Sequence, residues 1–412
     1  MQKLLININH LYGILDSNVK VLIGKDLSEV QQLDNAWLLI KDGLIVAFGI
    51  DKNFPNIDNV QIIDMKGKSI LPAFIDSHTH LVYAANRERE FEDRLSGLSY
   101  QEVAARGGGI LNSVRTLRGM SEDELFNAAS TRLANLIQWG TGAIEIKSGY
   151  GLDLDNECKM LRVIKRLKEQ FSIPIKATLL AAHAFPEEFK NNPNGYIELI
   201  INEIIPKVAE EKLADYIDVF CEEGYFNLEQ TDKILSAGKL YGLLPKIHVN
   251  QFNAIGGVAI ALKNEAISVD HLEEMTDEDI VLLSKSNCIA TSLPGCSFFI
   301  GIPYTPLKTL IDHNIAVNIA SDYNPGSTPT GNMQLMMSLA CIQQKLTPNQ
   351  AFNACTINAA AALQLQDQLG SITVDKKANL IVTKANSLAF FPYAYGENKV
   401  YQMIIDGEFV ND

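Results

Sequence analysis

His78 and His80 are the residues whose spacing points most directly to chemistry in this chain. They follow an apolar run over residues 70–76 that is typical of a buried strand. Because alternate residues of a strand face the same way, both imidazoles can reach one point in space. Two converging imidazoles indicate a zinc or iron site, whereas two surface histidines that merely alternate would carry no such function.

Eight short apolar runs recur through the middle of the chain, and stretches with helical character separate them. The runs cover residues 70–76, 142–147, 175–182, 216–221, 243–249, 266–269, 288–292 and 316–320. Amphipathic segments such as 122–139, 156–170 and 198–212 lie between them. Eight strand–helix repeats predict an α/β fold with a TIM-like (β/α)8 barrel. A doubly wound sheet is the alternative, although it usually has fewer strands.

Polar residues that can bind metals or transfer protons gather at the carboxyl ends of these runs. They are His78, His80, Lys147, His183, residues 221–223, His248, Asp270, His271 and Asp322. Five of the seven histidines belong to this set, and the active sites of such barrels lie at that end of the strands. We expect the other two, His10 and His313, on the surface or in local packing.

Three imidazoles and one carboxylate form a possible metal-binding set: His78, His80, His248 and Asp322. These donors suit zinc or iron and leave a position for water. Asp322 can also take a proton from that water and pass it to a leaving nitrogen. His271 can orient or activate water or bind substrate; alternatively, it is only a strand-end histidine bonded near Asp270.

Lys147 raises the question of a second metal, because a carbamylated lysine can bridge two ions. In barrels of this class the bridging residue ends the fourth strand, whereas Lys147 follows the second run. We therefore expect a single metal and an ion pair between Lys147 and a carboxylate such as Glu145. Cys221 can ligate a metal by its chemistry, but a buried structural thiol is the better interpretation.

Loops beyond the strands hold groups that suit a small polar substrate. Arg87 has a planar guanidinium that matches a carboxylate, whereas residues 88–90 next to it indicate a solvated run of charges. Tyr150 lies in a loop with two glycines after the second run. The turn after Asp322 can offer amide, backbone N–H and hydroxyl groups, from Asn324, Gly326 and Ser327.

Both ends of the chain carry the pattern of strand, Asp-Gly turn and strand, at residues 42–43 and 406–407. Asp-Gly supplies the positive φ angles of a tight hairpin. A further short apolar run covers 379–383. We expect the two ends, 1–69 and 366–412, to form one small β-sandwich domain beside a metal-dependent hydrolase barrel over 70–365.

Composition argues against several partners and locations. The formal charge is −14, from 35 basic and 49 acidic residues, so no basic face remains for nucleic acid or an anionic membrane. The six cysteines form no CxxC pair, which indicates reduced thiols in the cytoplasm. The N-terminus lacks the apolar core of a signal peptide, and no run approaches the length of a membrane span.

The chain resembles the amidohydrolase superfamily and, within it, the imidazolonepropionase family. Five segments carry the resemblance: 72–80, 106–110, 145–152, 269–272 and 321–327. The first is shared across the superfamily. The motifs Lys-Ser-Gly-Tyr-Gly-Leu and Ser-Asp-x-Asn-Pro-Gly, in the third and fifth segments, are much more particular to the family.

The resemblance implies hydrolysis of the cyclic amide C–N bond of 4-imidazolone-5-propanoate, which gives N-formimidoyl-L-glutamate in histidine degradation. It implies one zinc or iron ion per chain, held by His78, His80, His248 and Asp322. The substrate-binding residues that it implies are Arg87, on the propionate, with Tyr150, His183, Gln251, Asn324, Gly326 and Ser327. We further expect a homodimer.

Gln251 lies three residues after His248, where members of the family have Glu or Gln. An amide cannot act as a base, so Asp322 or His271 must move the proton. A deaminase-like aminohydrolase is one alternative, but it would be expected to have Glu at this position, and Arg87 also argues against it. A non-catalytic scaffold is another alternative. The retention of all four metal ligands argues against it.

Overall fold

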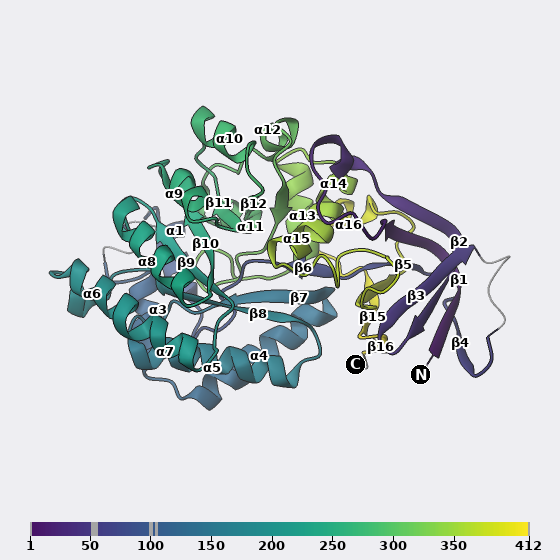
Figure 1. Ribbon diagram of the computed structural model, residues 1–412, viewed down its shortest axis with the longest axis horizontal. Helices are drawn as coiled ribbons and strands as arrows, with labels where there is room; N and C mark the ends of the chain where they lie inside the picture. Colours follow the sequence, from purple (N-terminus) through teal and green to yellow (C-terminus); the bar gives the residue numbers. More distant parts are fainter. Residues whose placement is uncertain (1, 51–56, 99–101, 104–105, 411–412) are drawn as a thin grey trace.

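The computed structural model describes residues 2–50, 57–98, 102–103 and 106–410, and it has two joined parts (Figure 1). The larger part is an eight-stranded parallel sheet in which each strand pairs with the next one in chain order. Its strands are β6 (Phe74–Asp76), β7 (Thr141–Lys147), β8 (Ile175–Ala182), β9 (Tyr216–Cys221), β10 (Leu244–Val249), β11 (Ser268–His271), β12 (Ile289–Ser292) and β13 (Val317–Ile319). This is the strand order of a TIM-like barrel, so the predicted fold class is confirmed.

The barrel closes just beyond the ends of β6 and β13. The backbone N–H of Asp322 donates to the carbonyl oxygen of His78 at 3.0 Å, and that of His80 donates to Tyr323 at 2.9 Å. A parallel bridge between Thr79 and Tyr323 lies between these two bonds. The seam therefore brings the first and last strands of the barrel together at their carboxyl ends.

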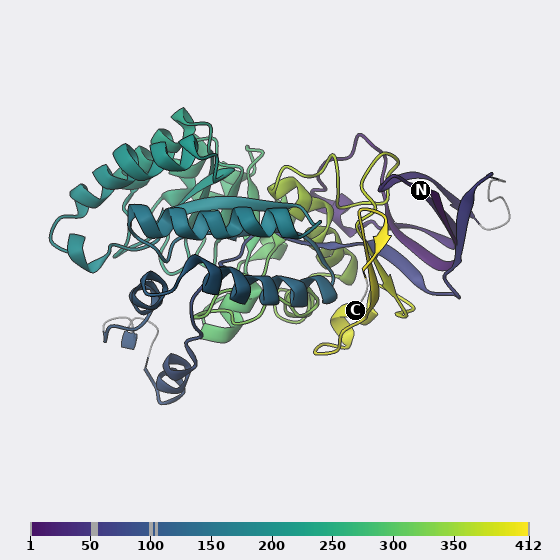
Figure 2. The same ribbon diagram turned by 90° about the horizontal axis from the view of Figure 1, so that it is seen from below.

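Helices cover the outer face of the barrel (Figures 1 and 2). The described helices of the chain are α1 (Glu88–Leu95), α3 (Ile110–Arg118), α4 (Glu122–Gln138), α5 (Leu154–Gln170), α6 (Pro193–Leu199), α7 (Ile205–Glu210), α8 (Leu228–Leu240), α9 (Gly257–Lys263), α10 (Asp277–Leu283), α11 (Pro294–Ile300), α12 (Leu307–Asp312), α13 (Met333–Ile342), α14 (Pro348–Cys355), α15 (Ile357–Ala362) and α16 (Phe390–Tyr393), with the short segments η1 (Gly24–Ser28), η3 (Glu187–Phe189) and η4 (Ile200–Ile204). The predicted helices at 122–139 and 156–170 are confirmed as α4 and α5. The third predicted helix, 198–212, begins earlier, because Asn192 caps α6 and Pro193 occupies its first position.

The smaller part is a mixed sheet built from both ends of the chain (Figure 1). Its strands are β1 (Gln2–Ile14), β2 (Gln31–Lys41), β3 (Leu44–Ile50), β4 (Val60–Asp64), β5 (Ser69–Pro72), β14 (Leu380–Thr383), β15 (Val400–Ile405) and β16 (Glu408–Phe409). Both predicted Asp-Gly turns have positive φ angles: 49° and 82° at Asp42 and Gly43, and 46° and 75° at Asp406 and Gly407. The sequence analysis expected the two ends of the chain to form a β-sandwich. In the structure their strands belong to one continuous sheet.

The apolar run over 70–76 is two strands, so its prediction as one strand was wrong. β5 pairs with β14 in the terminal sheet, and β6 pairs with β7 in the barrel. Between them, the Ala73 N–H donates to the carbonyl oxygen of Asn379 at 2.9 Å. Hydropathy cannot reveal this switch, because both strands are fully buried. The predicted domain limits, 1–69, 70–365 and 366–412, stay a prediction, and β5 extends across the first of them.

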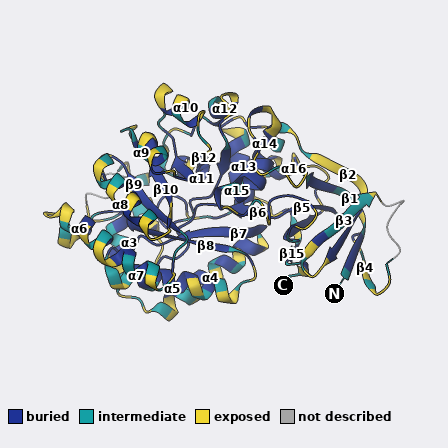
Figure 3. Ribbon diagram, in the orientation of Figure 1, coloured by how far each residue is buried: buried dark blue, intermediate teal, exposed yellow. Residues whose placement is uncertain are grey.

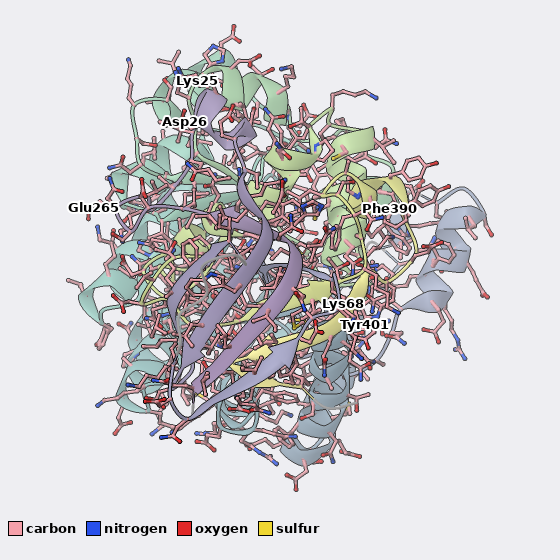
Figure 4. All side chains as sticks on the ribbon, turned by 90° about the vertical axis from the view of Figure 1, so that its right-hand side faces the viewer. Lys25, Asp26, Lys68, Glu265, Phe390 and Tyr401 are labelled. Atoms are coloured by element: carbon pink, nitrogen blue, oxygen red, sulfur yellow. The ribbon has the colours of Figure 1, made fainter. Side chains whose placement is uncertain are left out.

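Burial differs sharply between the barrel strands and the surrounding helices (Figure 3). β7 and β9 are buried along their entire length, and β7 carries Glu145 and Lys147 into the interior. On the side of the molecule seen in Figure 4, the Lys68 ammonium lies 4.6 Å from the centre of the Tyr401 ring, a surface cation–π contact.

Among the described helices, none combines the length and the apolarity that crossing a membrane requires.

Candidate active site

A pocket opens at the carboxyl ends of the barrel strands, where the sequence predicted an active site. It encloses about 430 Å³ of space, part of it open to solvent. Its lining consists of His80, Arg87, Ile110, Tyr150, His183, Phe220, His248, Gln251, Phe252, His271, Asp322, Asn324 and Ser327. Of the predicted site residues, all of which the structure describes, only His78 and Gly326 lie outside this lining.

Three imidazole nitrogens and one carboxylate oxygen meet at one side of the pocket. The Nε2 atoms of His78 and His80 lie 3.6 and 3.5 Å from Oδ1 of Asp322. Nε2 of His248 lies 3.4 Å from Nε2 of His80. A tetrahedral ion with bonds of about 2.1 Å separates its ligands by about 3.4 Å. His78, His80 and Asp322 therefore have the spacing of ligands around one ion, and His248 lies beside them, next to His80.

The protonation state of these nitrogens, and a missing hydrogen-bond partner at one of them, also fit a metal. Nε2 of His78 is buried and has no hydrogen-bond partner within the described structure, which would cost about 1–3 kcal/mol if the atom stayed unsatisfied. Burial lowers the pKa of His78, His80 and His248 well below the usual range, so the rings are neutral. Neutral imidazole is the form that binds a metal, and nitrogen donors favour zinc or iron over magnesium.

An aspartate lies against the Nδ1 edge of two of these rings. Nδ1 of His78 is 2.7 Å from Oδ2 of Asp270, and Nδ1 of His248 is 2.9 Å from Oδ2 of Asp218. Burial opposes ionisation of Asp270, but the positive charges of Lys246 and Lys147 bring its pKa below the usual value. Since an ionised carboxylate only accepts, Nδ1 of His78 must carry the proton, which leaves Nε2 for a metal.

A model of the amidohydrolase family matches residues 69–410 of the chain. An imidazolonepropionase from Christiangramia forsetii is 52% identical over 411 residues, 100% of each chain. The chain belongs to the imidazolonepropionases of the amidohydrolase family. Imidazolonepropionases from Flavobacterium psychrophilum, 51% identical over 100% of both chains, and from Clostridium tetani, 41% identical over 94% of this chain and 93% of that one, are similar as well.

Solved structures share the fold at much lower identity. Guanine deaminase from E. coli has a TM-score of 0.76 at 15% identity and covers 100% of this chain and 99% of its own. An adenosine deaminase from Xanthomonas campestris with bound zinc has a TM-score of 0.71 at 14% identity, over 99% of this chain and 92% of that one. The imidazolonepropionase chain described here thus combines this fold with a buried His/Asp group able to bind a metal.

His271 belongs to β11 itself and has a strained backbone. Its φ angle is 89°, and that of the next residue, Leu272, is 65°, both in the left-handed region that non-glycine residues rarely adopt. Nδ1 of His271 lies 3.3 Å from Oε1 of Glu273, so its partner is Glu273 rather than Asp270. Burial opposes protonation, but Glu273, Asp322 and Asp270 together raise the pKa of His271. The ring is thus close to the metal-binding carboxylate and suited to proton transfer.

Asp322 begins a turn that Asn324 holds in shape. The Asn324 amide group donates to the Asp322 carbonyl oxygen and to the Ser327 hydroxyl, both at 2.7 Å, and its Oδ1 accepts the N–H groups of Gly326 and Ser327, both at 2.8 Å. All four hydrogen-bonding positions of the amide are filled. Ser327 donates to Oδ2 of Asp322 at 3.1 Å. Burial raises the pKa of Asp322 to about 6, against the opposing effects of His271 and Ser327.

Arg87 is held by Glu90, which the sequence placed in a solvated run of charges. That prediction was wrong for Glu90, because its side chain is only 12% exposed and its Oε2 lies 3.1 Å from Nε of Arg87. Glu90 also accepts the N–H of Gly109 at 3.1 Å and the amide of Asn112 at 2.9 Å. Gly326 packs against the guanidinium: a Cβ atom there would lie 1.8 Å from Nη2 of Arg87. Glu90 and Gly326 thus set where Arg87 lies.

His183, Tyr150 and Gln251 line the side of the pocket near His80 and Cys296. The His183 ring stacks on His80 with centroids 5.0 Å apart, and Tyr150 lies 5.4 Å from His183. Burial lowers the pKa of His183 to about 4. Its Nδ1 lies 3.0 Å from the Gly149 carbonyl oxygen, which can only accept, so the neutral ring has Nε2 as an acceptor. The Gln251 amide lies 3.4 Å from the Cys296 sulfur.

The sequence predictions for Lys147, Cys221, His10 and His313 are confirmed. Nζ of Lys147 is 2.8 Å from Oε1 of Glu145. Cys221 is buried and does not line the pocket. His10 contacts Asp34 at 2.7 Å, and Nδ1 of His313 is 2.8 Å from the Thr309 carbonyl oxygen, so both have local partners away from the pocket.

Sequence reasoning missed two groups of residues. The apolar wall of the pocket, Ile110, Phe220 and Phe252, was invisible to a search for polar side chains. The charged residues behind the site, Asp218 and Lys246, were missed as well. Strand alternation could have found Lys246, because it lies two residues before His248 and so faces the same side of β10.

Proposed function

We propose that this chain hydrolyses 4-imidazolone-5-propanoate to N-formimidoyl-L-glutamate. Water adds to the ring carbonyl carbon, and the bond from that carbon to the ring nitrogen breaks. The observation that carries the proposal is that one pocket is lined by His80, His248 and Asp322 of the His/Asp metal-binding group and by Arg87, whose guanidinium matches the propionate. Full-length similarity to curated imidazolonepropionases supports the same substrate.

We propose one zinc or iron ion per chain on His78, His80, His248 and Asp322. Such an ion, when bound, makes water a stronger nucleophile at neutral pH and polarises a carbonyl oxygen. Three neutral nitrogens and one carboxylate are donors that suit either metal. The close spacing of these donors favours one ion over two.

Asp322 and His271 are the proposed catalytic residues for proton transfer. Either side chain can accept the proton of the attacking water and return it to the ring nitrogen as that nitrogen becomes basic. Glu273 orients the His271 ring through Nδ1, so Nε2 is the atom that handles the proton. Gln251 also lines the pocket, but its amide cannot accept a proton at neutral pH.

The other residues of the pocket hold the substrate. Arg87 binds the propionate, and its position is set by Glu90. Tyr150, His183 and Gln251 offer a hydroxyl, an imidazole acceptor and an amide to the planar ring. The hydrogen-bonding positions of the Asn324 amide are already filled within the turn, so we propose that Asn324 and Gly326 act by shaping this turn. The Ser327 hydroxyl also faces the pocket.

The direct test is to incubate the purified protein with 4-imidazolone-5-propanoate and to follow the loss of its ultraviolet absorption. We expect a decay that depends on enzyme concentration, stops when a chelator removes the metal and yields N-formimidoylglutamate by mass spectrometry. Release of ammonia from cytosine or guanine, without action on the imidazolone, would instead identify a deaminase. No decay above the non-enzymatic rate at full metal occupancy would refute the proposal.

We also propose a homodimer that works in the cytoplasm. All six cysteines lie in the described chain as free thiols, five of them buried, which suits a reducing compartment. Several large aromatic side chains near the C-terminus are exposed, among them Tyr393 at 79% and Tyr395 at 68%, and such side chains are common at subunit contacts. Sedimentation equilibrium tests the subunit number, and a purely monomeric mass would overturn this part.

A further inference from the structure

Two fully buried lysines lie behind the metal-binding histidines, and the proposed reaction does not use them. Lys147 is on β7 and Lys246 is on β10, and both have 0% exposure. Three equally buried carboxylates surround them, those of Glu145, Asp218 and Asp270. Buried charges of this kind are rare unless they are paired, because their removal from water is costly.

The contacts within this cluster tie both lysines to the same carboxylates. Nζ of Lys147 is 2.8 Å from both Glu145 and Asp218 and 3.8 Å from Asp270. Nζ of Lys246 is 2.8 Å from the other oxygen of Glu145 and 3.7 Å from Asp270. Two cations thus face three carboxylates, which leaves one negative charge in excess. A carbamate on Lys147 would place a fourth anion among them, so this lysine acts as an ammonium and does not bridge two metals.

The cluster touches the metal-binding residues at three points. Asp270 contacts Nδ1 of His78 at 2.7 Å. Asp218 accepts the backbone N–H of His248 at 3.1 Å and lies 2.9 Å from Nδ1 of that ring. Lys246 donates to the carbonyl oxygen of Ser77 at 2.8 Å, directly before His78. For His78, the Asp270 contact lies at Nδ1, whereas Nε2 of the same ring faces Asp322.

We propose that Lys147 and Lys246 are positioning residues that hold Asp270 and Asp218 as acceptors for the metal-binding histidines. Asp270 keeps the proton of His78 on Nδ1, so that Nε2 points to Asp322 and to the metal. Without the lysines, the crowded carboxylates repel one another and can no longer hold the rings in place. The inference rests on the proposed ligand set, and partners of this type set metal affinity.

A purely structural role is the competing explanation, and metal affinity distinguishes the two. The test uses the variants Lys147→Met and Lys246→Met and measures the zinc dissociation constant by competition with a chelator. Circular dichroism gives the folded fraction, and the d–d absorption of the cobalt-substituted protein reports ligand geometry. We expect 10- to 100-fold weaker zinc binding by folded protein and an altered cobalt spectrum.

Lys376→Met is the matched control. Lys376 is also buried, at 3% exposure, but it donates to the Leu369 carbonyl oxygen and the Ser371 hydroxyl, away from the pocket lining. The Lys376→Met protein should bind zinc with the same affinity as the wild type. Folded Lys147→Met and Lys246→Met proteins with wild-type zinc affinity and cobalt spectra would overturn the inference.

A second measurement uses the wild-type enzyme, so its result does not depend on whether a variant folds. In the histidine-¹⁵N-labelled, metal-loaded enzyme, we expect a proton on Nδ1 of His78 and none on its Nε2. A proton on Nε2 would overturn the inference. A wrong assignment of the metal ligands would give a different result. In that case the double variant His78→Ala and His80→Ala would retain a wild-type metal content.

Discussion

The backbone N–H of Asp322 donates to the carbonyl oxygen of His78 across the seam of the barrel, at 3.0 Å. These two residues come from opposite ends of the barrel sequence, after β13 and after β6. The bond fixes the register of the two segments, and it places Oδ1 of Asp322 3.6 Å from Nε2 of His78. The contact that closes the barrel therefore also brings His78 and Asp322 of the metal-binding group together.

Metal content should be about one ion per chain and should depend on the two histidines after β6. Replacing His78 and His80 together by alanine removes two of four donors, so elemental analysis should find almost no bound metal. His313→Ala removes a histidine with only a local partner and should leave the metal content unchanged. Two ions per active wild-type chain would contradict the single-ion site.

Arg87 should lose its carboxylate-binding position when Gly326 gains a methyl group. In Gly326→Ala the new Cβ would meet Nη2 of Arg87 at 1.8 Å, so the guanidinium must move. We expect kcat/KM to fall about 10- to 100-fold, equivalent to about 1.5–3 kcal/mol for a hydrogen-bonded charge, and mostly through KM. Arg87→Lys should lose a similar amount, because it lacks the planar fork.

The control for this effect is Gly119→Ala, whose Cβ would meet only ordinary contacts and should leave kinetics unchanged. An analogue without the propionate separates binding from folding defects. If Gly326→Ala and Arg87→Lys slowed the analogue as much as the acid, the assigned role of Arg87 would be wrong.

His271 should matter to turnover more than Gln251 does. His271→Asn should keep a near-normal metal content and lower kcat by about 10²–10⁴-fold, the usual contribution of a general acid–base group. Gln251→Ala should raise KM more than it lowers kcat, because it loses only substrate hydrogen bonds. Rates are compared at full metal occupancy. Loss of turnover in Gln251→Ala with turnover retained in His271→Asn would reverse the assignment.

Asn324 should contribute to stability more than to substrate binding. Asn324→Ala leaves the buried N–H groups of Gly326 and Ser327 without their acceptor, at a cost of about 1–3 kcal/mol for each unsatisfied group. Urea unfolding should show this loss. Ser327→Ala keeps both N–H groups paired and should destabilise the protein less. Equal stability of Asn324→Ala and wild type would show that the amide is not structural.

The contribution of Lys376 to stability should grow as pH increases from about 8 toward 10. Burial lowers the pKa of Lys376 to about 8, from 10.5 in the unfolded chain. Between these values the unfolded chain binds more protons, so raising the pH favours the folded state. Between pH 8 and pH 10, the change in the free energy of unfolding, measured with urea, should be more positive in wild type than in Lys376→Met. Equal changes would mean that Lys376 titrates normally.

Local patterns in the sequence were sufficient for much of the architecture and for several residues of the candidate metal-binding group. Strand alternation in His78 and His80, the position of His248 and Asp322 at run ends, and Asp-Gly at both hairpins each depend on neighbouring residues alone. The parallel order of the barrel follows from the repeat itself. These features are set by backbone geometry and hydropathy, which act over a few residues.

Contacts between distant segments were decided only by the tertiary structure. The switch of sheets at Ala73, the support of Arg87 by Glu90 and the seam between His78 and Asp322 depend on which strands and loops become neighbours. The buried lysines belong here too: Lys246 meets Glu145 only because β10 and β7 face each other across the barrel interior. Charge pairing at such distances depends on sheet register and barrel closure, which short-range patterns along the chain do not encode.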